Sequence, residues 1–213
     1  MLVKNRMTLN PITVTPDTPV SEAYSILREH SLRRMPVVKN GRLVGIVTEK
    51  ALERISPSDA TTLSVFELNY LLTKMTVKDA MTKDPYTIQD EDLVENAAVL
   101  MRDKDVGALP VMRGDRLVGI ITINDIFDAF IDMLGVRTAG ARLALRVPDN
   151  PGVGADVFTI IGKYDVNIQN VAYIRGRNGA ELTLRLDTDD ASDIKRAMLA
   201  KGYEIIEERE AAK

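Results

Sequence analysis

The sequence of 213 residues contains no cysteine and no tryptophan, and its single histidine is His30. The absence of cysteine excludes disulfides, thiol catalysis and zinc or iron–sulfur sites held by thiolates. His30 has no second histidine to join it in a metal site, so we expect it at the surface or in packing. Aromatic residues make up only 5% of the chain. Alanine, valine, isoleucine and leucine must therefore fill the core.

The chain also lacks a strong excess of charge and a long apolar run. Its 28 basic and 31 acidic residues give a net charge of −3, which provides no general attraction to nucleic acid. No apolar stretch reaches membrane-spanning length, and the first residues contain none of the signal-peptide kind. We therefore expect a cytoplasmic protein with neither nucleic acid nor membrane as a partner.

Motifs of common enzyme classes are missing too. There is no Gly-x-x-x-x-Gly-Lys loop for phosphate and no Gly-x-Ser-x-Gly nucleophile turn. The acidic runs at residues 90–92 and 189–190 precede apolar helical stripes, so helix capping accounts for them. The sequence thus predicts no catalytic residue and no metal site. A non-enzymatic protein is the leading hypothesis, and an enzyme with an unrecognised site is the alternative.

One sequence motif occurs twice in the chain. Residues 34–48 read RMPVVKNGRLVGIVT, and residues 108–122 read ALPVMRGDRLVGIIT. The offset is 74 residues, from Thr48 to Thr122, and it continues upstream without a gap, where Met7 aligns with Met81. A gapless internal repeat of this length predicts two copies of one supersecondary unit.

Both copies predict the same elements in the same order. A short extended piece (12–14, 86–88) follows a proline, and an amphipathic helix comes next. Two β-branched strands then meet at an Asn-Gly or Gly-Asp turn, which is typical of a hairpin. A short helix closes each copy, at 49–55 and 123–134. Between the copies, residues 56–63 have turn chemistry and residues 65–72 are expected to form a helix in a packed connector.

The pattern changes after Gly140. Expected strands at 142–147, 166–173, 181–186 and 203–207 alternate with helices over 153–161 and 191–199. The order β-α-β-β-α-β is that of the ferredoxin-like arrangement. The short stretch 136–140 is the expected boundary, so the whole chain is predicted to be an α+β protein of two domains, 1–136 and 140–213.

The repeat resembles the CBS motif, and the two copies resemble a CBS pair, or Bateman module. The resemblance rests on the apolar-Pro-Val strand start and on the ending apolar-Gly-apolar-apolar-Thr-x-x-Asp. It places the first motif at about 7–56 and the second at about 81–134. The family resemblance implies two motifs related by a pseudo-twofold, with two clefts that commonly accept adenine nucleotides.

The same resemblance implies roles for individual residues. Asp125 matches the aspartate that binds ribose, and Thr122 matches the hydroxyl that contacts sugar or phosphate. Basic residues before the apolar-Pro-Val start, here Arg33 and Arg34, are frequent phosphate contacts. The expected nucleotide site consists of Thr87, Ile88, Leu109, Pro110, Thr122, Asp125, Arg33 and Arg34. The alternatives are a helix-terminal carboxylate for Asp125 and a solvated charged pair for the arginines.

The first cleft departs from the family pattern. Ala51 stands where the second copy has Asp125, so the ribose acceptor is absent. A weaker site at Thr13, Met35, Pro36 and Thr48 is therefore expected there. The ligand implied by the resemblance is AMP, ADP or ATP, while S-adenosylmethionine, NAD and a cyclic dinucleotide remain open.

The tail resembles an ACT domain over roughly residues 140–213. The matching residues are Asp149-Asn150-Pro151-Gly152-Val153 and Val166-Asn167-Ile168. The resemblance implies a sheet that pairs with a second subunit and an amino-acid effector at Asn150, Gly152, Val153 and Asn167. A sheet used only for dimerisation is the alternative.

The complete order of motifs resembles proteins of the acetoin-utilisation (AcuB) type. This resemblance implies a homodimeric ligand sensor that regulates an unidentified enzyme, within acetoin or acetate metabolism. A structural scaffold with empty clefts is the competing hypothesis.

Overall fold

The computed structural model describes residues 1–55, 75–177 and 179–209 of the chain, and the description below refers to them. The expected connector, with its turn chemistry at 56–63 and its helix at 65–72, lies outside these residues. The chain forms two compact units, Met1–Phe127 and Asp128–Lys213. Both units mix helices and strands.

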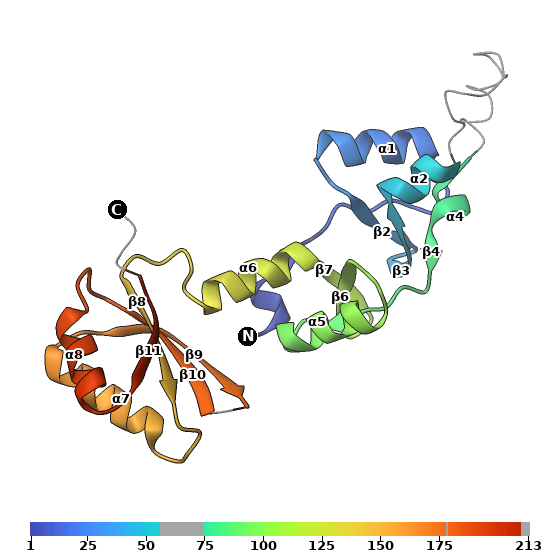
Figure 1. Ribbon diagram of the computed structural model, residues 1–213. Coiled ribbons are helices and arrows are strands. Elements are labelled where there is room, and N and C mark those ends of the chain that lie inside the picture. The colour runs from blue at the N-terminus through green and yellow to red at the C-terminus, as the bar shows by residue number, and fades with distance from the viewer. Residues whose placement is uncertain (56–74, 178, 210–213) are drawn as a thin grey trace. The chain divides into compact units, whose positions relative to one another are not determined.

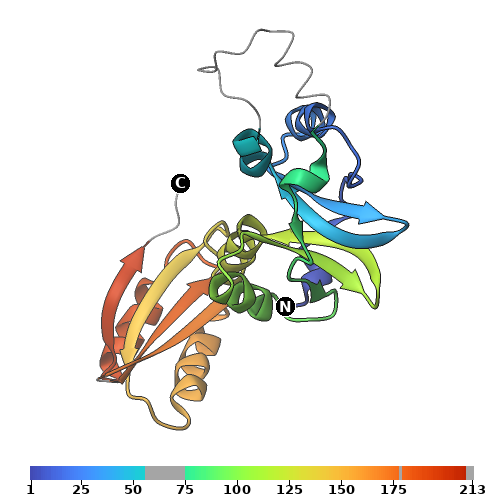
Figure 2. The ribbon, with the colours of Figure 1, turned by 90° about the vertical axis from the view of Figure 1, so that its right-hand side faces the viewer.

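The two copies of the repeat fold alike in the first unit. The first contains α1 (Val20–Glu29), β2 (Arg34–Lys39), β3 (Arg42–Thr48) and α2 (Glu49–Ile55). The second contains α5 (Val94–Asp103), β6 (Ala108–Arg113), β7 (Arg116–Thr122) and α6 (Ile123–Met133). The predicted helices and hairpins are thus present, and Figure 2 shows the two hairpins next to each other.

The first hairpin turns where the sequence predicts. Asn40 and Gly41 both have positive φ angles, 52° and 76°. A two-residue turn with positive φ at both positions matches the right-handed twist of the strands, and Asn-Gly tolerates this conformation best. The local sequence therefore determines the hairpin register.

Short strands preceding each copy were not predicted. They are β1 (Thr8–Leu9) and β4 (Thr82–Lys83), and β5 (Ile88–Gln89) lies slightly after the expected extended piece. β1 pairs antiparallel with β7, and β4 pairs antiparallel with β3. The resulting sheets have the orders β1-β7-β6-β5 and β2-β3-β4. β1 and β4 are therefore exchanged between the copies, since each extends the sheet of the other copy, whereas β5 pairs with β6 of its own copy.

The exchange includes more than the short strands. We call residues 1–9 and 75–83 the lead-in segments. They contain a 3-10 helix, η1 (Val3–Asn5), and the short helix α4 (Val77–Ala80). The Val3 amide donates to Asp92 O at 2.8 Å, and the Val77 amide donates to Thr18 O at 2.9 Å. Each lead-in segment thus packs on the copy to which it does not belong in sequence.

The exchange explains the glycine repeated in both copies. A methyl group on Gly45 would lie 2.9 Å from the Thr82 carbonyl oxygen, and one on Gly119 would lie 3.0 Å from the Thr8 carbonyl oxygen. The side chains of Met81 and Met7 would also be in the way. Met7 and Met81 are equivalent positions of the lead-in segments. Only glycine leaves space for a backbone to pass this closely, so both copies need it for the same reason.

The second unit has the predicted order of elements. They are β8 (Ala141–Val147), α7 (Val153–Ile161), η2 (Gly162–Tyr164), β9 (Ile168–Gly176), β10 (Gly179–Leu186), α8 (Ser192–Ala200) and β11 (Glu204–Arg209). The strands form one antiparallel sheet in the order β11-β8-β10-β9 (Figure 1). The helices α7 and α8 cover one face of it.

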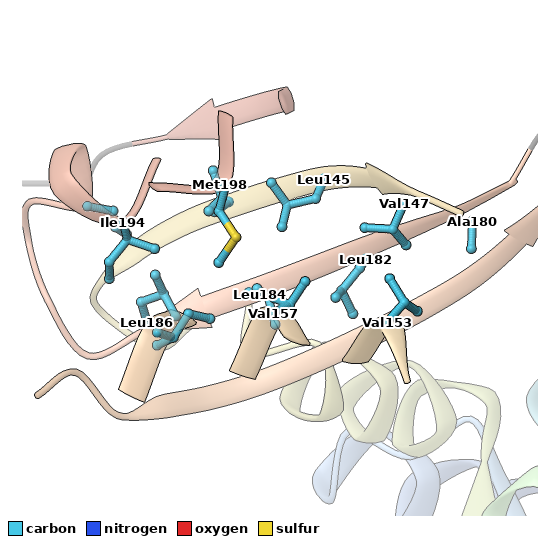
Figure 3. Packing of buried hydrophobic residues seen from close by; sticks show 14 residues of the cluster. Leu145, Val147, Val153, Val157, Ala180, Leu182, Leu184, Leu186, Ile194 and Met198 are labelled. Carbon is cyan, nitrogen blue, oxygen red and sulfur yellow. The ribbon is translucent and has the colours of Figure 1, made fainter. Parts of the chain in front are cut away.

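Alternating residues of the sheet build the core of this unit. Leu143 and Leu145 of β8 pair with Leu184 and Leu182 of β10, and all four are buried. Val157 of α7 packs against them, as Figure 3 shows. In β10, buried apolar residues alternate with less buried ones, as expected for a sheet with one covered face.

The two units divide inside α6, between Phe127 and Asp128, which is earlier than the expected boundary at 136–140. The Asn170 side chain of β9 donates to the Met133 carbonyl at 2.9 Å. Arg185 of β10 donates to the Thr138 carbonyl, also at 2.9 Å. These contacts attach the last turn of α6 and the following segment to the second unit.

Candidate functional site

A cavity of about 740 Å³ opens in the first unit. Both copies contribute to its wall, because the exchanged β1 carries the following loop to the side of β7. The described residues that line it are Thr8, Asn10, Pro11, Ile12, His30, Ser31, Leu32, Arg33, Arg34, Pro36, Gly107, Ile120, Thr122, Ile123 and Asn124. The lining described here therefore contains two arginines and no carboxylate.

Arg34 reaches from the first copy to the second. A methyl group built on Gly107 would lie only 2.7 Å from Nη1 of Arg34, so the guanidinium occupies the space beside this glycine. Burial, together with the positive charge of Arg33, lowers the pKa of Arg34. Within the described part of the chain, neither arginine has a carboxylate partner. The cavity therefore holds an uncompensated positive charge that favours an anionic ligand.

Thr122 and Asp125 form a capping box at the start of α6. The Asp125 carboxylate accepts from both the amide and the hydroxyl of Thr122, each at 2.7 Å. The Asp125 amide in turn donates to Oγ1 of Thr122 at 3.4 Å. All these contacts of the carboxylate use Oδ2, so Asp125 both caps the helix and keeps Oδ1 available. Asp125 itself is not among the lining residues, but it borders them, because Thr122, to which it is hydrogen-bonded, and Asn124, which precedes it, both line the cavity.

The first copy has only half of this arrangement. The Ala51 amide donates to Oγ1 of Thr48 at 3.2 Å. Alanine has no carboxylate, so nothing at this position can accept a hydrogen bond from a ribose. The equivalent cleft consequently lacks the acceptor that Asp125 offers.

The structure brings some of the predicted site residues together and separates others. Arg33, Arg34, Pro36 and Thr122 line the same cavity, although Pro36 was assigned to the weaker first cleft. Ile88, Leu109, Pro110 and Met35 are buried in the cores of the two copies. Thr87 lines a separate cavity of about 430 Å³, while Thr13 is exposed and Thr48 is half-buried.

Several lining residues were missing from the sequence prediction. The loop 8–12 reaches the cavity only through the exchange of β1, which no local pattern indicates. His30, expected at the surface or in packing, is exposed and lines the cavity wall. Gly107, which stands at the position equivalent to Arg33, was also not predicted to line the site. The space beside Gly107 is occupied by Arg34, which is far away in sequence, so no local pattern indicates the contact.

The second unit has its own cavity at the start of α7. It measures about 440 Å³, and its lining includes Asn150, Gly152 and Val153, three of the four residues that the sequence assigns to an effector site. Asn167, the fourth predicted residue, is not among the residues described there. Lys201 also lines the cavity and lies 3.5 Å from Asp156. Burial, followed by the charge of Asp156, raises the pKa of the neighbouring Tyr203.

Residues 3–57 and 77–132 match the CBS domain, just over half of the chain. The chain belongs to the CBS domain family. Both matched ranges begin inside a lead-in segment, and together they cover the two repeated copies. The cavity described above is therefore formed within a pair of CBS domains.

Among curated proteins, the chain is similar to an inosine-5′-monophosphate dehydrogenase of Korarchaeum cryptofilum. The two are 30% identical over 176 residues, which is 82% of this chain but 34% of the dehydrogenase. The chain thus spans about a third of the length of that relative.

Solved structures resemble the CBS pair. CBSX2 of Arabidopsis thaliana, solved in complex with AMP, is 27% identical with a TM-score of 0.53, covering 62% of this chain and 97% of CBSX2. The CBS pair of protein MJ0100, in complex with 5′-methylthioadenosine and S-adenosylmethionine, is 29% identical with a TM-score of 0.50, covering 61% and 95%. A putative acetoin utilisation protein (AcuB) of Vibrio cholerae is 25% identical with a TM-score of 0.53, covering 64% and 95%.

Among the described residues, no helix has the length and apolar character needed to cross a membrane. No group of three or more histidine, aspartate or glutamate side chains among them could hold a metal ion.

Proposed function

We propose that this CBS protein is a non-enzymatic regulatory sensor that binds an adenosine-containing nucleotide in the cavity of its CBS pair. The observation that carries the proposal is the cavity shared by Arg33, Arg34 and Thr122, with Asp125 at its border. Arginine binds phosphate oxygens in pairs through its planar fork, and a carboxylate oxygen can accept from ribose hydroxyls. The AMP complex of CBSX2 supports this ligand class.

The proposal assigns the C-terminal unit to the ACT type. Its strand order β11-β8-β10-β9, with two helices on one face, supports a ferredoxin-like β-α-β-β-α-β domain. An amino-acid effector would bind beside Asn150, Gly152 and Val153, where the start of α7 faces a cavity. The similarity to the AcuB protein supports a role in regulating acetoin or acetate metabolism through a partner enzyme.

Calorimetric titration of adenosine, AMP, ADP and ATP into the full chain tests the nucleotide proposal. Replacing both Arg33 and Arg34 by Ala should weaken ATP and ADP much more than adenosine, because only the phosphates lose their partners. Arg116→Ala, at an exposed position outside the cavity, serves as the control. Absence of binding by all four ligands would instead favour the scaffold with empty clefts.

A further inference from the structure

The guanidinium of Arg34, in the first copy, lies against Gly107 of the second copy at the wall of the cavity. We propose that Gly107 is a specificity-determining residue, whose missing side chain seats the Arg34 guanidinium for phosphate and so selects nucleoside phosphates over S-adenosylmethionine. The inference rests on the proposed nucleotide function and refines it. Its basis is the 2.7 Å separation between Nη1 of Arg34 and the place where a side chain on Gly107 would begin.

The backbone fixes Gly107 at the place where the phosphate partner is needed. The Ile123 amide, at the start of α6, donates to the Gly107 carbonyl at 3.2 Å. Thr122 precedes that amide and lines the same cavity. The Arg34 guanidinium against Gly107 and the Thr122 side chain therefore line the same cavity, although Arg34 itself belongs to the other copy.

The equivalent arrangement cannot form on the other side of the pair. At an offset of 74 residues, Arg34 corresponds to Ala108 and Gly107 corresponds to Arg33. Ala108 is too short to reach the other copy, and the long side chain of Arg33 stands at the position where Gly107 leaves the space open. At the same offset, Asn10, Ser31 and Ile123 of the cavity wall correspond to Asp84, Asp105 and Glu49, while His30 and Asn124 correspond to Lys104 and Lys50. The equivalent wall therefore has mixed charge and lacks the contact between Arg34 and Gly107, so we expect one nucleoside phosphate per chain.

The charge of the cavity also separates ligand classes that share the adenosine group. S-adenosylmethionine carries a sulfonium and an ammonium group against a single carboxylate, and so has a net positive charge. Two guanidinium groups without a carboxylate partner repel such a ligand, while they attract di- and triphosphates. Binding order should therefore follow phosphate charge, with ATP tightest and S-adenosylmethionine weakest.

Gly107→Ala tests the contact directly. The φ angle of Gly107 is not in the left-handed region, and the atoms that obstruct a methyl group are the flexible end of Arg34. The variant should therefore fold normally but displace the guanidinium. ATP affinity should fall by roughly tenfold, the size expected for one charged hydrogen bond, while adenosine affinity stays unchanged. Gly154→Ala, which meets no atom within 4 Å, is the matched control.

A double-mutant cycle with Arg34→Ala separates this role from a general change of cavity shape. Once Arg34 is replaced, Gly107→Ala should cause no further loss of ATP affinity. Additive losses, equal losses for ATP and adenosine, or unchanged ATP affinity in Gly107→Ala would each overturn the inference while leaving the nucleotide function intact. A parent chain that binds S-adenosylmethionine more tightly than ATP would overturn it too. If the parent binds none of these ligands, the proposed function fails as well.

Discussion

Asp125 and Asp79 perform the same local task at two helix starts, and only Asp125 borders the cavity. Asp79 accepts from the Thr76 amide at 2.9 Å and from its hydroxyl at 3.1 Å, as Asp125 does from Thr122. The hydrogen bond from the Thr76 amide is the main reason why the pKa of Asp79 is lowered. Because the two boxes are alike, Asp79 offers a control for the structural part of any change at Asp125.

Asp125→Ala should weaken adenosine, AMP and ATP together, because all three carry the ribose hydroxyls. Losing a hydrogen bond to a charged group costs about 1.5–3 kcal/mol, roughly tenfold to over a hundredfold in affinity. Both Asp125→Ala and Asp79→Ala should lower the free energy of unfolding by about 1 kcal/mol through the lost cap. Calorimetry and denaturant unfolding measure the two effects separately. Parent-like AMP and ATP binding by Asp125→Ala would remove it from the ribose site.

At the scale of elements, local patterns were sufficient for the hairpins and the longer helices. The apolar spacing of α1 and the Asn40-Gly41 turn act over a few residues, so the sequence exposes them directly. The strands β1 and β4 contain two residues each and pair with the other copy, so no local period marks them. The cavity depends on this exchange. The sequence therefore predicted that Arg34 and Thr122 lie together, but it did not predict the lining by loop 8–12 or the contact between Arg34 and Gly107.

Because each lead-in segment packs on the other copy, equivalent mutations in the two segments should destabilise different hairpins. Val3 and Val77 are fully buried at equivalent positions of the lead-in segments. Val3→Ala and Val77→Ala should each cost about 2 kcal/mol, from two lost methyl groups and the cavity they leave. Hydrogen exchange should then rise mainly in β6 and β7 for Val3→Ala, but in β2 and β3 for Val77→Ala. Faster hydrogen exchange confined to the hairpin that follows each mutation in sequence would contradict the packing of each lead-in segment on the other copy.

At the scale of the whole molecule, the two edges of the C-terminal sheet differ. The edge strand β9 has nine residues without proline, and Ile174 on it is 60% exposed. The other edge, β11, has six residues, a bulge between Ile205 and Glu207, and an exposed ion pair between Glu204 and Arg146. β9 is also bulged, at Gln169, but its residues 170–176 pair with β10 without interruption. Bulges and charges protect edges from pairing, whereas a long uninterrupted stretch invites it. β9 is thus the edge suited to a second copy of this chain.

We therefore expect a homodimer in which β9 pairs antiparallel with β9 of a second copy about a twofold axis, alongside contacts between the CBS pairs. Ile174→Lys places like charges close to that axis and should weaken the dimer by about tenfold or more, since like charges across paired strands repel. Ile206→Lys, at an exposed position on β11, should leave the dimer unchanged. Light scattering over a concentration series measures both. Pairing through β9 places only that edge at the interface, so only Ile174→Lys should weaken the dimer. A monomeric parent at micromolar concentration, or equal effects of the two variants, would therefore refute it.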